Sequence, residues 1–196
     1  DAPFTQSSVF SAAILLLDAE EKVLAERFLT HLAESLDRTQ IGQMGQMLED
    51  LGLPHVQVML GKRAAQYGHE VHAPYYALHP LAQVEHPVPT ELVLSIARRE
   101  SEFDPGVISP VGARGLMQVM PRTAQEVAGW LDVEYSEAKL LTDPVYNAVL
   151  GATYLERLAQ QFNGNAVMIA AGYNAGPSRP ERWMQERGDP RRGDMD

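Results

Sequence analysis

Apolar residues recur at helical spacing along most of the chain, and Pro and Gly separate one such stretch from the next. The segment 19–36 shows the pattern with Val23, Leu24, Phe28, Leu32 and Leu36. A stripe that repeats every three to four residues is typical of an amphipathic helix, whereas a half-buried strand alternates at every second residue. No segment carries a comparable alternating pattern. The chain is therefore predicted to be mainly α.

Capping residues and prolines indicate where several of these helices begin. Pro54 is predicted to be the first residue of one helix, and Asp143 followed by Pro144 predicts the cap and first residue of a long one. Thr90 is predicted to cap the helix that carries Glu100. Short helix pairs in the first part of the chain are similar to the units of a helical stack, although they show no clean internal repeat.

A proline-rich segment, 73–89, separates the two halves of the chain. It contains Pro74, Pro80, Pro87 and Pro89. Proline removes a backbone donor and disrupts helix interiors, so this segment favours a connection over a continuous helix. We predict a boundary here, with a helical stack and linker in residues 1–86 and a second domain in residues 87–196.

Composition excludes several classes of protein. The chain has 196 residues, of which 45% are apolar and 21% charged, as in an ordinary globular protein. The net charge of −10 argues against a general nucleic-acid binder, which needs a basic face. The longest apolar run, Ala12 to Leu17, is far shorter than the roughly 20 residues of a membrane span, so no integral membrane segment is predicted. The absence of cysteine excludes disulfides and thiolate metal sites.

Glu100 stands where a helix is expected to bury an apolar side chain. Val93, Ile96 and Ala97 form one apolar stripe, and Glu100 continues it four residues after Ile96. One interpretation is that the helix ends here and the carboxylate reaches solvent. The other is that the carboxyl group is half-desolvated, so that its pKa is raised and it can donate a proton. Its position alone leaves both interpretations open.

The segment after this helix, Asp104–Gly115, contains three glycines and two prolines and is predicted to be an irregular loop. Apolar residues that follow it would anchor the loop, and Ser109 and Gln118 could present hydrogen-bonding groups. A surface loop with incidental polar residues would show the same pattern.

Several motifs, taken in order, resemble those of the soluble lytic transglycosylases of bacterial cell walls. They are Glu100-Ser101, Ser109–Ala113, Gly115–Gln118 with Met120-Pro121, and Gly172–Gly176. In the last motif Gly172 stands where the family has alanine. The match covers about Pro89 to Met184, and the earlier helix pairs with "HAPYYALHPL" are similar to the end of the helical superhelix in the large periplasmic members. The resemblance implies a lysozyme-like α-helical catalytic domain preceded by part of an α-superhelical domain.

The resemblance also implies a mechanism with a single carboxyl group, here that of Glu100. Protonated Glu100 would protonate the glycosidic oxygen that leaves N-acetylmuramic acid, while the sugar's own N-acetyl group stabilises the anomeric carbon. Glu100 would then take the proton of the C6 hydroxyl of the same sugar, which closes a 1,6-anhydro ring without consuming water. The positions that match substrate-binding residues of the family are Ser101, Ser109, Gln118, Met120, Tyr173 and Asn174. The hydroxyl of Tyr173 would reach towards the catalytic carboxyl group, whereas Asn174 fits better as a structural hydrogen-bonding residue. No cofactor is implied.

Other ionisable residues have simpler interpretations. Glu102 is predicted to point away from the face of Glu100, and Asp104 and Asp143 fit a turn and a helix cap. His69 and His72 in "HEVH" would be close enough to share a metal ion only if one helix contained both. Solvated histidines explain this motif better, so no metal site is predicted.

Two further functions stay open at this level. One is a lysozyme-like peptidoglycan hydrolase, which would need a positioned water molecule, and the other is a non-catalytic glycan-binding module. The expected partner is the glycan strand of peptidoglycan, and no pattern indicates a particular partner among the enzymes of cell-wall synthesis. A periplasmic location follows from that substrate. Because members of the resembled family continue beyond the point that corresponds to Asp196, the catalytic domain is expected to be truncated at its C-terminus.

Overall fold

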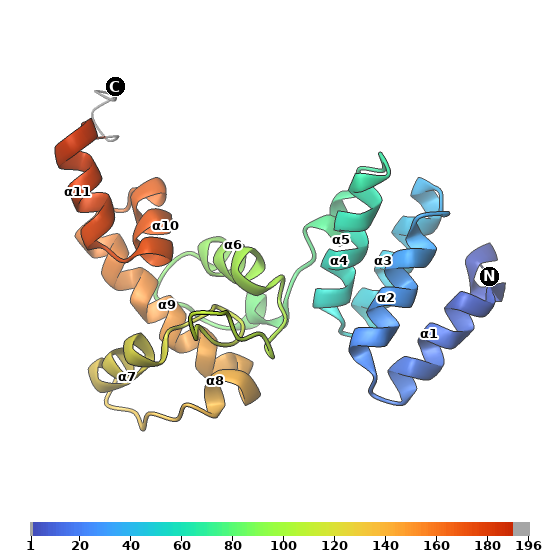
Figure 1. Cartoon of the computed structure of the whole chain (residues 1–196), viewed down its shortest axis with the longest axis horizontal. Coiled ribbons are helices and arrows are strands. Elements are labelled where there is room, and N and C mark those ends of the chain that lie inside the picture. The colour runs from blue at the N-terminus through green and yellow to red at the C-terminus, as the bar shows by residue number, and fades with distance from the viewer. Residues whose placement is uncertain (1, 190–196) are drawn as a thin grey trace. The chain divides into compact units, whose positions relative to one another are not determined.

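A computed structural model describes residues 2–189, and the chain divides into two compact units, Asp1–His79 and Pro80–Asp196 (Figure 1). The division falls inside the proline-rich segment. The assignment of residues 1–86 to a superhelical segment with its linker, and of residues 87–196 to a catalytic domain, stays a prediction.

The first unit is a stack of helices that pack pairwise around one apolar core. In chain order its elements are η1 (Pro3–Gln6), α1 (Ser8–Asp18), α2 (Lys22–Ala33), α3 (Arg38–Asp50), α4 (Pro54–Gln66) and α5 (His72–Tyr75). Helix α2 packs against α1 and α4, and α3 packs against α4 and α5. The largest fully buried side chains of this core are those of Leu29, Ile41, Met44, Leu48 and Leu60. Burial of these side chains provides the main favourable term for folding of the unit.

The predicted apolar stripe of segment 19–36 is correct for only two of its five residues. Leu32 and Leu36 are buried as predicted, but Val23, Leu24 and Phe28 are 64%, 41% and 38% exposed. The face that α2 buries carries Ala25 and Leu29. A helix with apolar residues on two faces can bury either face, so the neighbouring helices determine its orientation. Here α1 and α4 pack against α2, and the face with Ala25 is buried.

The second unit is arranged around one long helix. Its elements are η2 (Pro80–Gln83), α6 (Thr90–Ser101), α7 (Pro121–Trp130), α8 (Lys139–Thr142), α9 (Pro144–Gln161), α10 (Ala166–Ala175) and α11 (Ser178–Arg187). Helix α9 packs against α6, α7, α8 and α10, and Figure 1 shows it passing among them. Its buried face supplies Leu150, Leu155 and Leu158, all fully buried, to the core of the unit.

Two of the three predicted helix starts are confirmed. Pro54 is the first residue of α4. Asp143 caps α9, because its carboxylate accepts a hydrogen bond of 2.9 Å from the backbone N–H of Tyr146. The prediction for Thr90 was wrong: it is the first residue of α6, and the extended backbone of Pro89 occupies the capping position. Proline at this place sets the direction of the chain without a side-chain cap.

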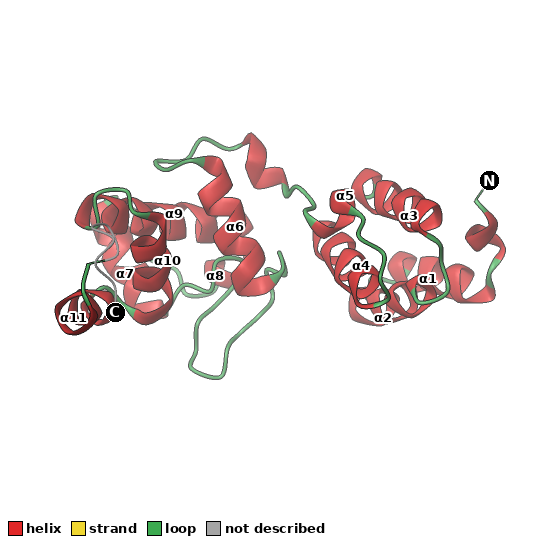
Figure 2. Ribbon diagram, turned by 90° about the horizontal axis from the view of Figure 1, so that it is seen from above, coloured by secondary structure: helices red, strands yellow, loops and turns green. Residues whose placement is uncertain are grey.

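The fold is mainly α, as predicted. Figure 2 shows helices joined by loops, and within residues 2–189 the extended pairing consists of two isolated bridges, Ile108 with Arg114 and Arg114 with Val119. Over the same residues, none of the helices has the combination of length and apolar character that crossing a bilayer demands.

Candidate active site

Glu100 lies at the C-terminal end of α6, half-buried, one turn after Ile96. The helix ends directly afterwards, because Glu102 and Phe103 both have positive φ values, 49° and 66°. Residues other than glycine avoid this conformation, and here the buried ring of Phe103 offsets its cost. The abrupt end of α6 allows the following loop to turn back beside Glu100.

Burial raises the pKa of the Glu100 carboxyl group above its ordinary value, because desolvation disfavours the charged form. The guanidinium group of the neighbouring Arg99 opposes this effect and lowers the pKa, but burial is the larger cause. The half-buried position of Glu100 and the raised pKa of its carboxyl group agree with the second interpretation of the sequence, and its role as a proton donor stays a prediction. Such a group keeps its proton to higher pH than an exposed glutamate does.

The loop 104–119 is a compact and internally bonded segment. Its backbone closes on itself through hydrogen bonds of 2.9 Å from Ser109 N to Ala113 O and 3.1 Å between Arg114 and Val119. The hydroxyl oxygen of Ser109 also accepts a bond of 3.0 Å from Ala113 N. The side-chain amide of Gln118 donates to Val107 O at 3.0 Å and to Gly115 O at 2.9 Å. The loop is thus held in one conformation by its own polar groups.

Helix α9 fixes this loop from below through Asn147, a residue that the sequence analysis did not single out. The side chain of Asn147 is fully buried and makes three hydrogen bonds. Its amide donates to Arg114 O at 2.8 Å and to Leu140 O at 3.0 Å, and its carbonyl accepts from Met117 N at 2.8 Å. A buried amide whose two N–H groups and carbonyl oxygen are all hydrogen-bonded is a strong constraint on the segments it joins.

Two glycines allow the loop to approach α8 and α9 closely. A Cβ atom on Gly115, whose φ is +72°, would lie 1.9 Å from Leu140 O of α8 and 2.5 Å from the side-chain nitrogen of Asn147 on α9. A Cβ atom on Gly151 of α9 would lie 2.6 Å from the sulfur of Met117, whose side chain is fully buried against the helix. Residues 114–119 therefore rest directly on α9.

Tyr173 of α10 completes the support, because its hydroxyl donates a hydrogen bond of 2.8 Å to Met117 O. The backbone of Met117 is held on both sides, at N–H by Asn147 and at C=O by Tyr173. Burial is the main cause that raises the pKa of Tyr173, and the charge of Glu100 raises it further. Tyr173 therefore stays protonated and lies within electrostatic reach of Glu100. Its hydroxyl bonds to the loop, and the prediction that it also reaches towards the carboxyl group of Glu100 stays a prediction.

The other predicted substrate-binding residues differ in exposure. Met120 is 40% exposed and Asn174 is exposed, while Gln118 is half-buried. Ser101 is only 3% exposed, and its hydroxyl donates to Leu116 O at 2.7 Å. Ser101 thus joins α6 to the loop, and this position suits support of the site better than contact with a sugar.

The nearby acidic residues have the structural roles that the sequence predicted. The Asp104 carboxylate accepts a bond of 2.8 Å from Gly106 N in a turn, and Asp143 caps α9. The condition for a metal site at His69 and His72 is not met, because α4 ends at Gln66 and only His72 lies in α5. Among residues 2–189, no three His, Asp or Glu side chains group in a way that could hold a metal ion.

The helical spacing of residues along α9 could have identified Asn147 from the sequence. Counting back from Leu155 in steps of one helical turn gives Gly151 and then Asn147, both buried. A polar residue on the buried face of a predicted helix is a candidate for a specific hydrogen-bonding role. Val145 and Val149 of the same helix, although apolar, are 49% and 37% exposed.

Comparison with known proteins agrees with this architecture. A family model described as "Transglycosylase SLT domain" matches residues 81–194. This match covers more than half of the chain, and the chain belongs to this family.

Individual relatives are similar over different parts of the chain. The soluble lytic murein transglycosylase of Escherichia coli K12 is 43% identical over 98 residues, which are 50% of this chain and 15% of that protein. The crystal structure of the 70 kDa soluble lytic transglycosylase from Escherichia coli is similar with a TM-score of 0.78 and 28% identity, over 94% of this chain and 31% of that one. A structure of the Pseudomonas aeruginosa lytic transglycosylase Slt is also similar, and its protein is an inactive mutant with glutamine in place of a glutamate. The TM-score is 0.71 and the identity 27%, over 92% of this chain and 30% of that one. The chain therefore spans less than a third of the length of these relatives.

Proposed function

We propose that this chain cleaves the β-1,4 bond between N-acetylmuramic acid and N-acetylglucosamine in peptidoglycan without hydrolysis, as a lytic transglycosylase. The observation that carries this proposal is Glu100, a half-buried carboxyl group whose pKa is raised by burial, at the edge of a loop fixed by Asn147 and Tyr173. Membership of the transglycosylase family supports the choice of substrate. The inactive glutamate-to-glutamine mutant of the Pseudomonas aeruginosa enzyme supports a reaction that depends on a glutamate.

In the proposed reaction Glu100 acts first as an acid and then as a base. The protonated carboxyl group gives its proton to the leaving glycosidic oxygen, and the N-acetyl group of the muramic acid stabilises the electron-poor anomeric carbon. The resulting carboxylate accepts the proton of the C6 hydroxyl, whose oxygen bonds to C1 and closes the 1,6-anhydro ring. Glu100 is thereby returned to its protonated form. A raised pKa favours the first step because it keeps the acid loaded.

The remaining predicted site residues divide into two proposed roles. Met120, Gln118 and Asn174, which are exposed or half-buried, would contact the sugars. Ser101, Ser109 and Tyr173 bond to backbone atoms of the loop and would act as positioning residues. No metal or cofactor has a step in this scheme. We further propose that the chain works in the periplasm, where peptidoglycan lies.

The test is a digest of purified peptidoglycan by the chain and by the Glu100→Gln variant, with the products resolved by mass spectrometry. The expected result is muropeptides that are lighter by one water than hydrolytic products, released by the parent chain and not by the variant. Glutamine keeps the size and hydrogen-bonding capacity of the side chain but cannot donate an acidic proton. Matching circular dichroism spectra of the two proteins would show that the loss is chemical.

Other outcomes would redirect the assignment. Products with free reducing ends would identify a lysozyme-like hydrolase and require a second carboxylate or a positioned water molecule. Binding of peptidoglycan without any product would identify a glycan-binding module. Equal activity of the Glu100→Gln variant would overturn the role of Glu100.

A further inference from the structure

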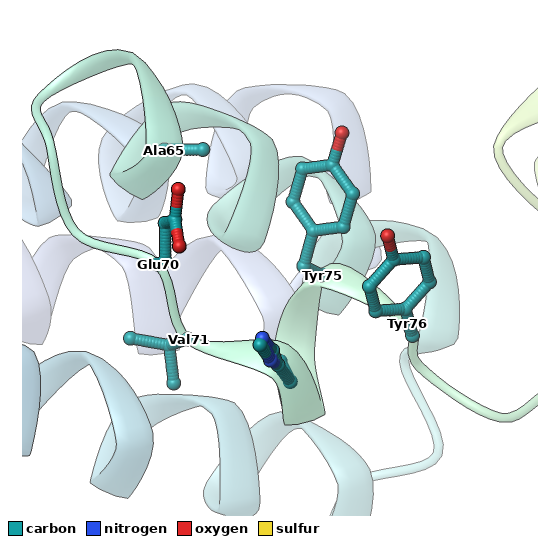
Figure 3. A pocket seen from close by; sticks show the side chains of 6 residues that line it. Ala65, Glu70, Val71, Tyr75 and Tyr76 are labelled. Atoms are coloured by element: carbon teal, nitrogen blue, oxygen red, sulfur yellow. The ribbon is translucent and has the colours of Figure 1, made fainter.

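The first unit contains a pocket of about 290 Å³, and the residues that line it have no role in the proposed reaction. It is lined by Ala65, Glu70, Val71, His72, Tyr75 and Tyr76 (Figure 3). These residues come from the end of α4, the turn after it and the short helix α5, which Tyr76 directly follows. The volume suits a small ligand or one ring of a larger one, since pockets for drug-sized ligands begin at roughly 300 Å³.

The backbone beneath the pocket is held in place by close packing. A Cβ atom on Gly61 of α4 would lie 2.4 Å from Tyr75 N, and a Cβ atom on Gly45 of α3 would lie 3.1 Å from Pro74. Helix α5 therefore rests directly on α3 and α4, with Pro74 buried between them. The aromatic side chains on α5 project from a fixed base, so little ordering is needed before a ligand binds.

Three aromatic rings form one wall. The rings of Tyr75 and Tyr76 meet edge to face, with centroids 4.9 Å apart and an interplanar angle of 69°, and the ring of His72 lies 6.3 Å from that of Tyr76. Tyr76 is 62% exposed, so the face of its ring is accessible to a ligand. Figure 3 shows Glu70 across the pocket from the two tyrosines.

The chemistry of the lining selects the kind of ligand. Among the described residues that line the pocket there is no Lys or Arg, and Glu70 contributes a negative charge. Anions such as phosphates or free carboxylates are therefore disfavoured. The tyrosine rings offer apolar faces, while Glu70, His72 and the tyrosine hydroxyls offer acceptors and donors. A pyranose ring presents C–H groups on its face and hydroxyl groups at its edge, which matches both features.

We propose that this pocket is a second saccharide-binding site, which takes a neutral N-acetylglucosamine unit of the glycan strand. The inference rests on the proposed function, since that function supplies the glycan. N-acetylmuramic acid fits less well, because its lactyl group adds a carboxylate or a peptide for which the pocket has no cationic partner. In this arrangement Tyr76 stacks on the sugar face and Glu70 accepts hydrogen bonds from its hydroxyl groups.

The test measures binding to insoluble peptidoglycan by co-sedimentation, with Glu100→Gln as the parent so that the substrate is not consumed. Adding Tyr76→Ala should weaken the apparent affinity by roughly three- to tenfold, the range that loss of one aromatic contact gives. Adding Glu70→Gln should weaken it as well, whereas Tyr76→Phe should retain most of the binding because the ring remains. The matched control is Tyr67→Ala, which removes another exposed tyrosine of the same unit outside the pocket and should leave the affinity unchanged.

A second measurement reports on the pocket directly. The protein with isotope-labelled tyrosine rings is titrated with tri-N-acetylchitotriose, and the resonance that Tyr76→Phe removes should shift. Unchanged sedimentation of both Tyr76→Ala and Glu70→Gln, or a Tyr76 signal that does not move, would overturn the proposal. The digest by the wild-type chain separates the two hypotheses. Cleavage by the wild-type chain, together with sedimentation that does not depend on Tyr76, would support the proposed function and remove the second site. Sedimentation that depends on Tyr76, without cleavage by the wild-type chain, would support the second site and remove the proposed function.

Discussion

At the scale of single residues, a glutamate that continues the buried face of a helix is subject to two opposing effects. Burial of Glu100 disfavours the ionised carboxylate, and the charge of Arg99 favours it. The larger effect is burial, so the folded chain holds this proton more tightly than the unfolded chain does. The same imbalance that would keep a catalytic acid loaded therefore costs stability at neutral pH.

The cost gives a prediction for Glu100→Gln. Because the folded-state pKa lies above the ordinary value, the stability that protonated Glu100 allows is fully present at acid pH and is lost as pH rises through the folded-state pKa. At pH 7 the variant should melt higher than the wild type, on the order of 2 °C, as a fraction of a kcal/mol would produce in a chain of this size. At pH 4 or below the difference should vanish.

Thermal unfolding followed by circular dichroism across this pH range checks the prediction. The control is Glu49→Gln, the same change at an exposed position on α3, which should show no such pH-dependent gain. A variant that is less stable than the wild type at pH 7 would mean that the carboxylate is better solvated than its burial indicates.

At the scale of elements, the loop 104–119 owes its shape to helices that are distant in sequence. Asn147 on α9 and Tyr173 on α10 fix the two sides of the Met117 backbone, and Ser101 on α6 bonds to the carbonyl of the preceding residue. A loop rich in glycine has a high entropic cost of ordering, and these buried bonds offset it. The result is a rigid segment beside Glu100.

Substitution of two glycines in this loop distinguishes the energetic cost of backbone strain from that of steric crowding. Gly112 and Gly115 both have positive φ, 89° and 72°, but a Cβ atom on Gly112 would meet no atom within 4 Å, whereas one on Gly115 would lie 1.9 Å from Leu140 O. Gly112→Ala should cost roughly 1–2 kcal/mol, from strain alone. Gly115→Ala should cost more than about 3 kcal/mol, because the loop must move away from α8 and α9 and break its bonds to Asn147.

Urea unfolding of the two variants measures the difference. The loss of peptidoglycan cleavage should follow the same order, with Gly115→Ala far more affected. Equal costs at the two positions would show that the loop can move away from α9 without penalty.

The sequence predicts these elements unevenly, for physical reasons. Helix starts at Pro54 and Asp143 depend on local geometry, so they could be read from neighbouring residues. The orientation of α2 could not, because Val23 and Ala25 lie on different faces and only the partners of the helix choose between them. The bond from Tyr173 to Met117 O joins residues 56 positions apart and ends on a backbone atom, so no side-chain pattern announces it.

At the scale of the whole molecule, the chain contains two units with separate cores. The family model covers residues 81–194, which fall in the second unit. The likeness to the Escherichia coli crystal structure covers 94% of the chain and therefore extends into the first unit. This extent supports the proposal that the first unit is part of a helical superhelix that accompanies the catalytic domain.

The segment that joins the units gives a prediction for limited proteolysis. Residues 76–79 lie outside any helix, and the side chains of Tyr76 and Leu78 are 62% and 69% exposed. Chymotrypsin cleaves after such residues when the chain is accessible, so the first cut should fall after Tyr76 or Leu78 and give two fragments that match the units. Mass spectrometry of the early products identifies the site, and a Tyr76→Gln, Leu78→Gln double variant should slow the cut. The loop 104–119, although it is irregular, should resist, because its backbone is bonded to α9 and α10. A first cut within that loop would contradict the rigid support on which the proposed site depends.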